Sequence, residues 1–349
     1  MSKIVTVFGA TGHQGGCVIR TILNDLDLSK EFKIRGVTRD ASKPEAQALA
    51  KQGIGITTAD MNSKDSLRQA LQNSHSVFLV TTPAWGTAGS DAELVHGKNV
   101  VDVAKEAGVE HLIFSSLLHV TGTTAGRLKH VPHFDQKAEV ERYIRSLGVP
   151  ATFVLREYFM TNYSMIGFIW KGENGIWTLA YPVGKEAKFP LIDISADMGK
   201  YVAASLRNRS ATPGTQLLGA EDYYTPTRIL EEFEQVTGNK TQFVLVDPET
   251  YKSFIPGPMG QEMLENHLFI ESPGYFNGKS LEESKELVAN ARYKLTTWKE
   301  FLEQNKNLFA WPGIEVKMML DGGRVEIVTN NLNLYQICNF HILSRYHMH

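Results

Sequence analysis

The chain has 349 residues, which suits one large domain or two lobes, and its 42% hydrophobic and 21% charged content is ordinary for a globular enzyme. A formal net charge of -2 excludes the basic surface of a nucleic-acid-binding domain, and no apolar run approaches the ~20 residues that span a bilayer. With no room for a secretory signal before the first strand and only two distant cysteines, Cys17 and Cys338, we expect a cytoplasmic protein, with the nucleus as a further location.

The first predicted elements are a strand and a helix that flank three glycines. Apolar and β-branched residues at 4–8 are followed by Gly9, Gly12 and Gly15 and by an amphipathic stretch at 17–23. This order is typical of the strand, tight turn and helix that open a dinucleotide site. Gly9 can take a positive φ, Gly12 lets the backbone approach a pyrophosphate, and Gly15 allows close packing of helix on strand. The helix N-terminus then attracts the phosphates, whereas the alternative, a plain βα turn, needs no such spacing.

The predicted second strand, residues 32–38, ends at Arg39, with Lys43 close behind. NAD-binding versions of this fold place an acidic residue here to bind the ribose hydroxyls. A guanidinium instead holds a 2′-phosphate by paired hydrogen bonds and stacks on the adenine. The sequence therefore favours NADP over NAD, the alternative being a solvated surface arginine.

Strands and helices go on alternating along the first half of the chain. Further strands are predicted at 54–58, 76–80, 111–116 and 151–155, and helices at 63–71, 93–107 and 134–147. Six strands alternating with helices indicate an α/β fold with a doubly wound parallel sheet of the Rossmann type. Ligands of such sheets bind at the carboxyl ends of the strands, where Trp85 is either a nicotinamide contact or packs on the sheet edge.

The second half of the chain predicts a smaller, mixed α/β lobe. We place the Rossmann domain at residues 1–156, the lobe at 157–312 and a tail of unknown role at 313–349. Within the lobe and tail, strands are predicted at 189–194 and 241–246, helices at 196–206 and 227–237, and a further strand or helix piece at 215–218. A capping box is predicted at Thr297 and Glu300, and a hairpin around Asp321-Gly322-Gly323.

Five stretches of the chain together resemble the NmrA-like family, relatives of the atypical short-chain dehydrogenases/reductases. They are G-A-T-G-H-Q-G-G at 9–16, V-T-R at 37–39, F-S-S at 114–116, T-A-G-R-L-K-H-V-P-H-F-D-Q-K at 124–137, and Asn162. The glycine motif alone is shared with many reductases, but its combination with H-F-D-x-K is much more specific. The likeness covers roughly residues 3–308 and is strongest to a branch of NADPH sensors.

The resemblance implies NADP(H) as cofactor and a C-terminal lobe that takes a small-molecule substrate or a regulatory protein partner; a homodimer is a further expectation. Met61 departs from the polar residue expected beside the adenine. The predicted cofactor-binding residues are Gly9, Ala10, Thr11, Gly12, His13, Gln14, Gly15, Arg39, Lys43, Asp60, Met61, Thr81, Thr82, Pro83, Lys137, Phe159 and Asn162.

Lys137 and His133 are the candidate catalytic residues. Typical short-chain reductases carry a proton-transferring tyrosine four residues before their lysine, and here His133 stands in that place. Histidine can transfer protons near neutral pH, the alternative being a cap or packing residue. Ser115 and Ser116 can hydrogen-bond a carbonyl or serve as turn residues.

Two functions stay open at this point. Without the tyrosine, the sequence leans toward a regulatory or weakly catalytic NADP(H) binder, a redox sensor. The alternative is an NADPH-dependent oxidoreductase that reduces a quinone, enone or carbonyl compound and uses Lys137. The sequence holds no zinc-ligand spacing, P-loop or serine-hydrolase elbow, so no metal site is expected.

Overall fold

Seven parallel strands form the central sheet of the computed structural model, which describes residues 2–83, 90–172, 174–255 and 257–309 and the backbone of 316–321 and 324–329. The strands are β1 (Lys3–Phe8), β2 (Phe32–Thr38), β3 (Gly55–Thr58), β4 (Ser76–Leu79), β5 (His111–Ser116), β6 (Ala151–Leu155) and β11 (Gln216–Leu218). Their order is β11-β6-β5-β4-β1-β2-β3, and every pair is parallel. The predicted doubly wound α/β fold is confirmed. The order reverses between β1 and β4, which makes this the crevice where such sheets bind ligands.

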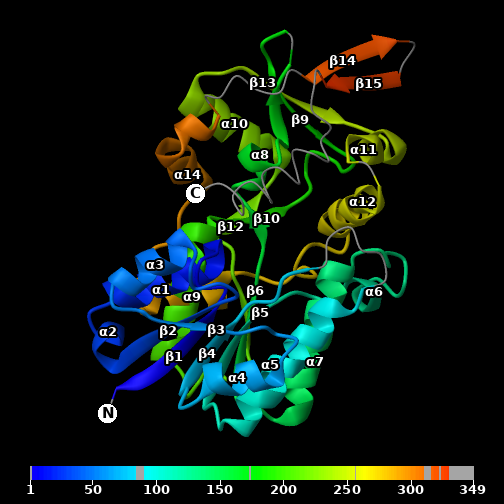
Figure 1. Cartoon of the computed structure of the whole chain (residues 1–349). Coiled ribbons are helices and arrows are strands. Elements are labelled where there is room, and N and C mark those ends of the chain that lie inside the picture. Colours follow the sequence, from blue (N-terminus) through cyan, green and yellow to red (C-terminus); the bar gives the residue numbers. More distant parts are fainter. Residues whose placement is uncertain are drawn as a thin grey trace.

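Helices cover both faces of the sheet (Figure 1). One face carries α4 (Lys64–Leu71), α5 (Ala92–Glu106) and α7 (Pro132–Leu147), and the other carries α1 (His13–Asn24), α3 (Pro44–Lys51), α9 (Ile194–Arg207) and α13 (Glu282–Asn290). Successive side chains of a strand point to opposite faces. On β5, Phe114 therefore packs in the core with α5 and α7, whereas Ile113 packs in the core with α1 and α9.

Smaller sheets and helices lie beyond the carboxyl ends of the central strands (Figure 1). One sheet contains β7 (Tyr158–Phe159), β10 (Phe189–Ile192) and β12 (Asp222–Tyr224), and another contains β8 (Ile169–Lys171), β9 (Trp177–Tyr181) and β13 (Thr241–Leu245). The remaining helices are α2 (Leu28–Glu31), α6 (Val120–Thr123), α8 (Asn162–Met165), α10 (Pro226–Thr237), α11 (Pro248–Phe254), α12 (Pro258–Glu271) and α14 (Trp298–Gln304).

Two local predictions in the second half are confirmed. Thr297 and Glu300 form the capping box of α14. Strands β14 (Val316–Asp321) and β15 (Arg324–Thr329) pair antiparallel, with Asp321 opposite Arg324, as the predicted hairpin requires.

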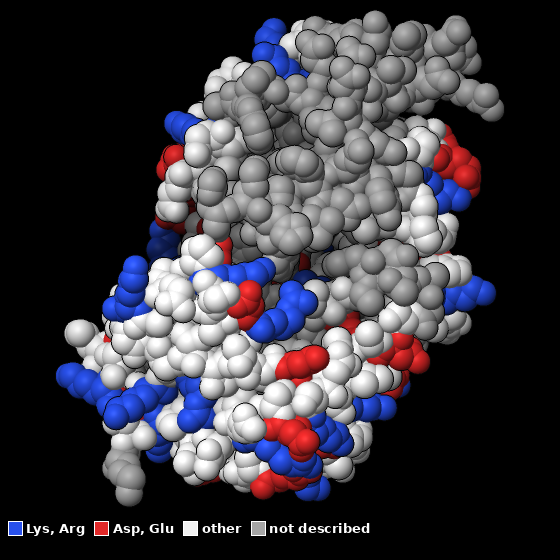
Figure 2. Space-filling view, viewed as in Figure 1, with Lys and Arg blue, Asp and Glu red and all other residues white. Residues whose placement is uncertain are grey.

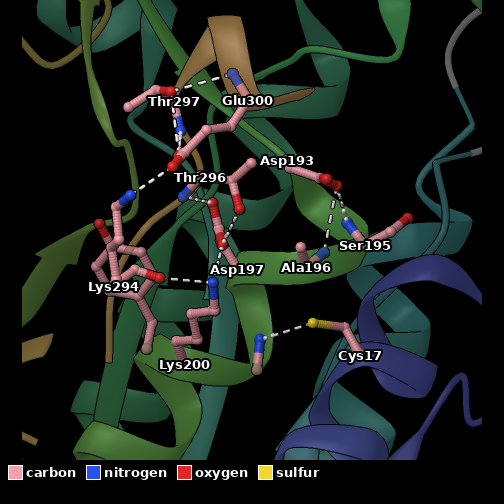
Figure 3. A network of polar contacts seen from close by, with 12 residues as sticks. Cys17, Asp193, Ser195, Ala196, Asp197, Lys200, Lys294, Thr296, Thr297 and Glu300 are labelled. Carbon is pink, nitrogen blue, oxygen red and sulfur yellow. Dashed lines mark hydrogen bonds and ion pairs between the residues drawn. The ribbon is translucent and has the colours of Figure 1, made fainter. Parts of the chain in front are cut away.

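Helix α9 links α1 to the segment that leads into α14 (Figure 3). The Gly199 N–H donates to the buried thiol of Cys17 at 3.2 Å. The buried carboxylate of Asp197 accepts hydrogen bonds from the N–H and the hydroxyl of Thr296, at 2.9 and 3.0 Å, and pairs with Lys200 at 2.6 Å. Helix α9 packs on the central sheet, and strand β11 is an edge strand of that sheet, although both follow residue 156. The division of the chain into domains at that residue stays a prediction.

The surface carries both signs of charge. Figure 2 shows blue and red side chains interspersed over the lower part of one face, in keeping with the net charge of -2. In the part of the chain that the structure describes, none of the helices combines the length and the apolar character that a bilayer-crossing segment requires.

Candidate functional site

The glycine turn lies at the switch point between β1 and β4. Gly9 has a φ of +63°, and its carbonyl accepts a hydrogen bond from the Gly12 N–H at 2.9 Å, which closes the turn. A Cβ on Gly15 would overlap the carbonyl of Gly9, so only glycine lets α1 pack this close to the turn. No side chain caps α1, and the Oε1 atom of Gln14 is buried without a partner among the described residues. The first turn of α1 therefore keeps N–H groups for a ligand or for water.

The neighbouring residues of the motif are placed around this turn. Ala10 is buried and its N–H donates to Val37, whereas Thr11 is exposed. The His13 ring is exposed and its Nδ1 lies 2.9 Å from the Ser195 hydroxyl, in the first turn of α9. The imidazole thus holds α1 against α9, and a cofactor contact of His13 stays a prediction.

The end of β2 presents the predicted 2′-phosphate residues. Arg39 is exposed, and in the described part of the chain its guanidinium has neither a hydrogen bond nor an ion pair. The nearest carboxylate in sequence, Asp40, accepts hydrogen bonds from the N–H and hydroxyl of Ser42. Lys43 is half-buried at the N-cap of α3. An unpaired guanidinium at the end of the second strand suits a phosphate.

The residues after β3 and β4 lie at the same edge of the sheet. Asp60 is exposed and accepts a hydrogen bond from the Asn62 N–H at 2.9 Å. The Met61 side chain packs partly buried against the core and offers no polar group to an adenine. Thr82 is exposed and Pro83 half-buried. Trp85 lies outside the described residues.

Lys137 is the centre of a buried polar cluster. Its ammonium donates to the backbone carbonyl and the hydroxyl of Thr81, at 2.9 and 2.8 Å, and pairs with the carboxylate of Glu93. The Thr81 hydroxyl donates to the same carboxylate at 2.6 Å. Lys137 and Glu93 are fully buried and Thr81 nearly so. The end of β4, the first turn of α5 and the second turn of α7 are thereby joined at the candidate site.

Burial and mutual attraction change the pKa values of Lys137 and Glu93. Removal from water lowers the pKa of Lys137 to about 8, although the Glu93 carboxylate acts in the opposite direction. For Glu93, burial alone would raise the pKa, but the Lys137 ammonium, the Thr81 hydroxyl and the Arg156 charge together hold that pKa below its usual value. Lys137 is therefore an ammonium that can give up a proton close to neutral pH.

His133 shares the buried face of α7 with Lys137, as their spacing predicts. Its Nδ1 contacts the carboxylate of Glu262 on α12, and burial lowers the pKa of the ring. His130, just before α7, likewise contacts the carboxylate of Glu265 on α12 through its Nδ1 atom. These two contacts join the start of α7 to α12. Proton transfer by His133 stays a prediction.

The two serines at the end of β5 differ in what their hydroxyls do. Ser116 donates to Glu141 of α7 at 2.6 Å. The Ser115 hydroxyl is buried and has no partner within the described chain. Of the two hydroxyls, that of Ser116 is therefore used within the protein, and that of Ser115 is left without a partner among the described residues.

The segment after β6 holds the last predicted residues and one that was not predicted. Phe159 and Asn162 are both half-buried, in β7 and at the start of α8. The Arg156 guanidinium lies 5.6 Å from the centre of the Phe159 ring. Sequence reasoning missed Arg156 and also Glu93, whose place in the first turn of a helix is a common one for acidic residues.

Residues 1–302 match the NmrA-like family. The chain belongs to the NmrA-like family. The resemblance noted in its motifs is confirmed. An NmrA-like family domain-containing oxidoreductase named malD, from Malbranchea aurantiaca, is 32% identical over an alignment of 292 positions that covers 79% of this chain and 84% of that protein. The oxidoreductase ptmS from Penicillium ochrochloron is 31% identical over 309 residues, with coverages of 83% and 91%.

Solved structures share the fold of this NmrA-like protein. NmrA, a negative transcriptional regulator, has a TM-score of 0.72 at 18% identity and covers 87% of this chain and 96% of its own. A triphenylmethane reductase from Citrobacter sp., complexed with NADP(H), has a TM-score of 0.70 at 21% identity, with coverages of 86% and 99%.

Proposed function

We propose that this NmrA-like protein is an NADP(H)-dependent oxidoreductase that reduces a quinone, enone or carbonyl compound. The observation that carries the proposal is the buried cluster of Lys137, Glu93 and Thr81 at the carboxyl edge of the sheet, in which burial lowers the pKa of the lysine to about 8. Two relatives of about 30% identity are named oxidoreductases, and a reductase of the same fold was crystallised with NADP(H). These names support an enzyme.

The residues present fit this cofactor. The uncapped N-terminus of α1 suits the pyrophosphate, and the unpaired Arg39 with Lys43 suits the 2′-phosphate. When bound, the nicotinamide ring supplies a hydride. The protein side of the reaction is the proton: Lys137 holds it at Nζ, 2.8 Å from the Thr81 hydroxyl, and the Ser115 hydroxyl can hydrogen-bond the oxygen of a carbonyl substrate.

A regulatory NADP(H) sensor is the second candidate function, and the absence of the usual proton-transferring tyrosine favours it. Sensor and reductase differ in turnover, not in cofactor binding. A cytoplasmic location, a regulatory partner and a homodimer likewise stay predictions.

Substituting Arg39 with alanine is expected to weaken NADPH binding by at least ~10-fold, because a charge-assisted hydrogen bond contributes ~1.5–3 kcal/mol. NADH lacks the 2′-phosphate, so its affinity should change little. Isothermal calorimetry with both cofactors measures the difference. Equal losses for NADPH and NADH would show that Arg39 does not read the 2′-phosphate.

The value of kcat/KM is expected to fall as the pH rises through about 8, because Lys137 must be protonated to donate. Removing the Glu93 charge takes away a group that raises the pKa of Lys137. In Glu93→Gln the alkaline limb of the profile should therefore move to lower pH. A limb that stays in place or moves to higher pH would argue against Lys137 as the donor.

A further inference from the structure

Among the described residues, the guanidinium of Arg156 has neither a hydrogen bond nor an ion pair. It follows β6 directly, and its backbone N–H donates to Ser116 at 3.1 Å, which fixes its place beside the end of β5. The side chain is half-buried, and its Nε atom is fully buried without a hydrogen bond in the described part of the chain. Burying part of a charge without a partner is costly. An unpaired guanidinium at this depth therefore needs an explanation.

The other half-buried arginines in the described chain are all satisfied. Arg35 donates to the carbonyls of Ala70 and Gln72, Arg209 pairs with Glu31, and Arg228 pairs with Asp222 and Glu232. Within these described residues, Arg156 alone combines partial burial with an unpaired guanidinium.

Two carboxyl groups that interact electrostatically with Arg156, those of Glu157 and Glu93, do not form an ion pair with it. Both carboxyl oxygens of Glu157 are buried without a hydrogen bond among the described residues, so Glu157 does not pair with Arg156, and burial raises the pKa of this carboxyl well above its ordinary value. Glu93 is already committed to Lys137 and Thr81. The Arg156 charge also lowers the pKa of both Lys137 and Glu93, which places it near the candidate catalytic lysine.

The phosphates of a dinucleotide lie too far away to be the missing partner. In the sheet order, β6 is separated from β1 by β5 and β4, and β2 lies one strand further. Strands are ~4.8 Å apart, so Arg156 stands ~14 Å from the glycine turn and further from Arg39. Since no carboxylate of the described residues pairs with Arg156 either, a second ligand is the source of the anion that we consider.

We propose that Arg156 binds a carboxylate of the substrate, so that the protein acts on a carbonyl or enone compound that also carries an acid group. The inference rests on the proposed function. A planar guanidinium binds a carboxylate through two parallel hydrogen bonds, and the Phe159 ring 5.6 Å away supports the cation from one side. The unpaired hydroxyl of Ser115 lies on the neighbouring strand β5 and would hydrogen-bond the carbonyl oxygen of the substrate.

The test uses a keto acid and its neutral ester. NADP-loaded protein is titrated by calorimetry with 4-oxo-4-phenylbutanoate and with its methyl ester, so that binding is measured without turnover. Wild type should bind the acid at least ~10-fold more tightly than the ester, in line with a charge-assisted pair. Arg156→Gln should lose that preference, and Arg156→Lys should keep only part of it, because an ammonium lacks the planar fork.

Two controls separate the possible failures. Arg292→Gln is the matched control, because Arg292 is exposed and lies in a segment that contributes none of the residues proposed to bind substrate or cofactor. This variant should keep the full preference for the acid. Arg156→Gln should bind NADPH as wild type does, which shows that it is folded. If wild type binds NADPH but shows no preference for the acid, or if Arg156→Gln retains the preference, the inference is wrong. If wild type does not bind NADPH, the proposed function itself fails, and the inference falls with it.

Discussion

Lys137→Met is expected to lower turnover by ~10²–10⁴-fold, the contribution of a positioned proton donor. It should also destabilise the protein by about 3–5 kcal/mol, because the buried Glu93 carboxylate loses its partner. Urea denaturation measures the stability, and NADPH oxidation measures the turnover.

The matched control is the double variant Glu93→Met/Lys137→Met. It replaces the buried ion pair with two apolar side chains, so most of the stability lost in Lys137→Met should return. Turnover should not return, because no proton donor has been restored. A double variant that is stable and fully active would show that Lys137 serves structure alone.

Gly15→Ala is expected to weaken NADPH binding by at least ~10-fold and to destabilise the fold by about 1–3 kcal/mol, the usual cost of overpacking. The new methyl group would overlap the carbonyl of Gly9 and lie 2.7 Å from that of Phe8, and both are backbone atoms that cannot turn aside. Helix α1 would have to move away from the turn that is expected to hold the pyrophosphate.

Gly16→Ala provides the comparison for this prediction. A Cβ at Gly16 would meet the flexible end of Arg20 at 3.2 Å and the carbonyl of Ala10 at 3.5 Å, contacts that the chain can absorb. Because alanine is the better helix former, this variant should be at least as stable as wild type and should bind NADPH normally. Equal effects of the two substitutions, measured by calorimetry and thermal unfolding, would contradict the close-approach role of Gly15.

The parts of the site that the sequence predicts are those built from local patterns. The strand–glycine–helix unit at the N-terminus needs only neighbouring residues, so its turn, including the positive φ of Gly9, follows from the motif. The same holds for Arg39 at the end of β2 and for the shared helix face of His133 and Lys137.

The parts that the sequence does not predict depend on contacts between distant segments. Glu93 and Lys137 are 44 residues apart, and nothing in either segment indicates that both are buried together. The spacing of apolar residues does not predict helix α12, because its buried face carries acidic residues and a histidine. One of these acidic residues is Glu262, which is paired with His133. The sequence predicts an element at 215–218, but only the pairing of β11 with β6 shows that these residues form the seventh strand of the central sheet.

The most direct test of the account mixes the purified protein with NADPH and a panel of quinones, enones, ketones and aldehydes, each tried with and without a carboxylate, and follows the absorbance of NADPH. The account predicts that wild type oxidises NADPH with at least one compound, and that the Glu93→Met/Lys137→Met variant does not at NADPH concentrations that saturate it. If wild type binds NADPH yet no compound is reduced faster than by that variant, the protein is an NADP(H) sensor and the reductase proposal is wrong.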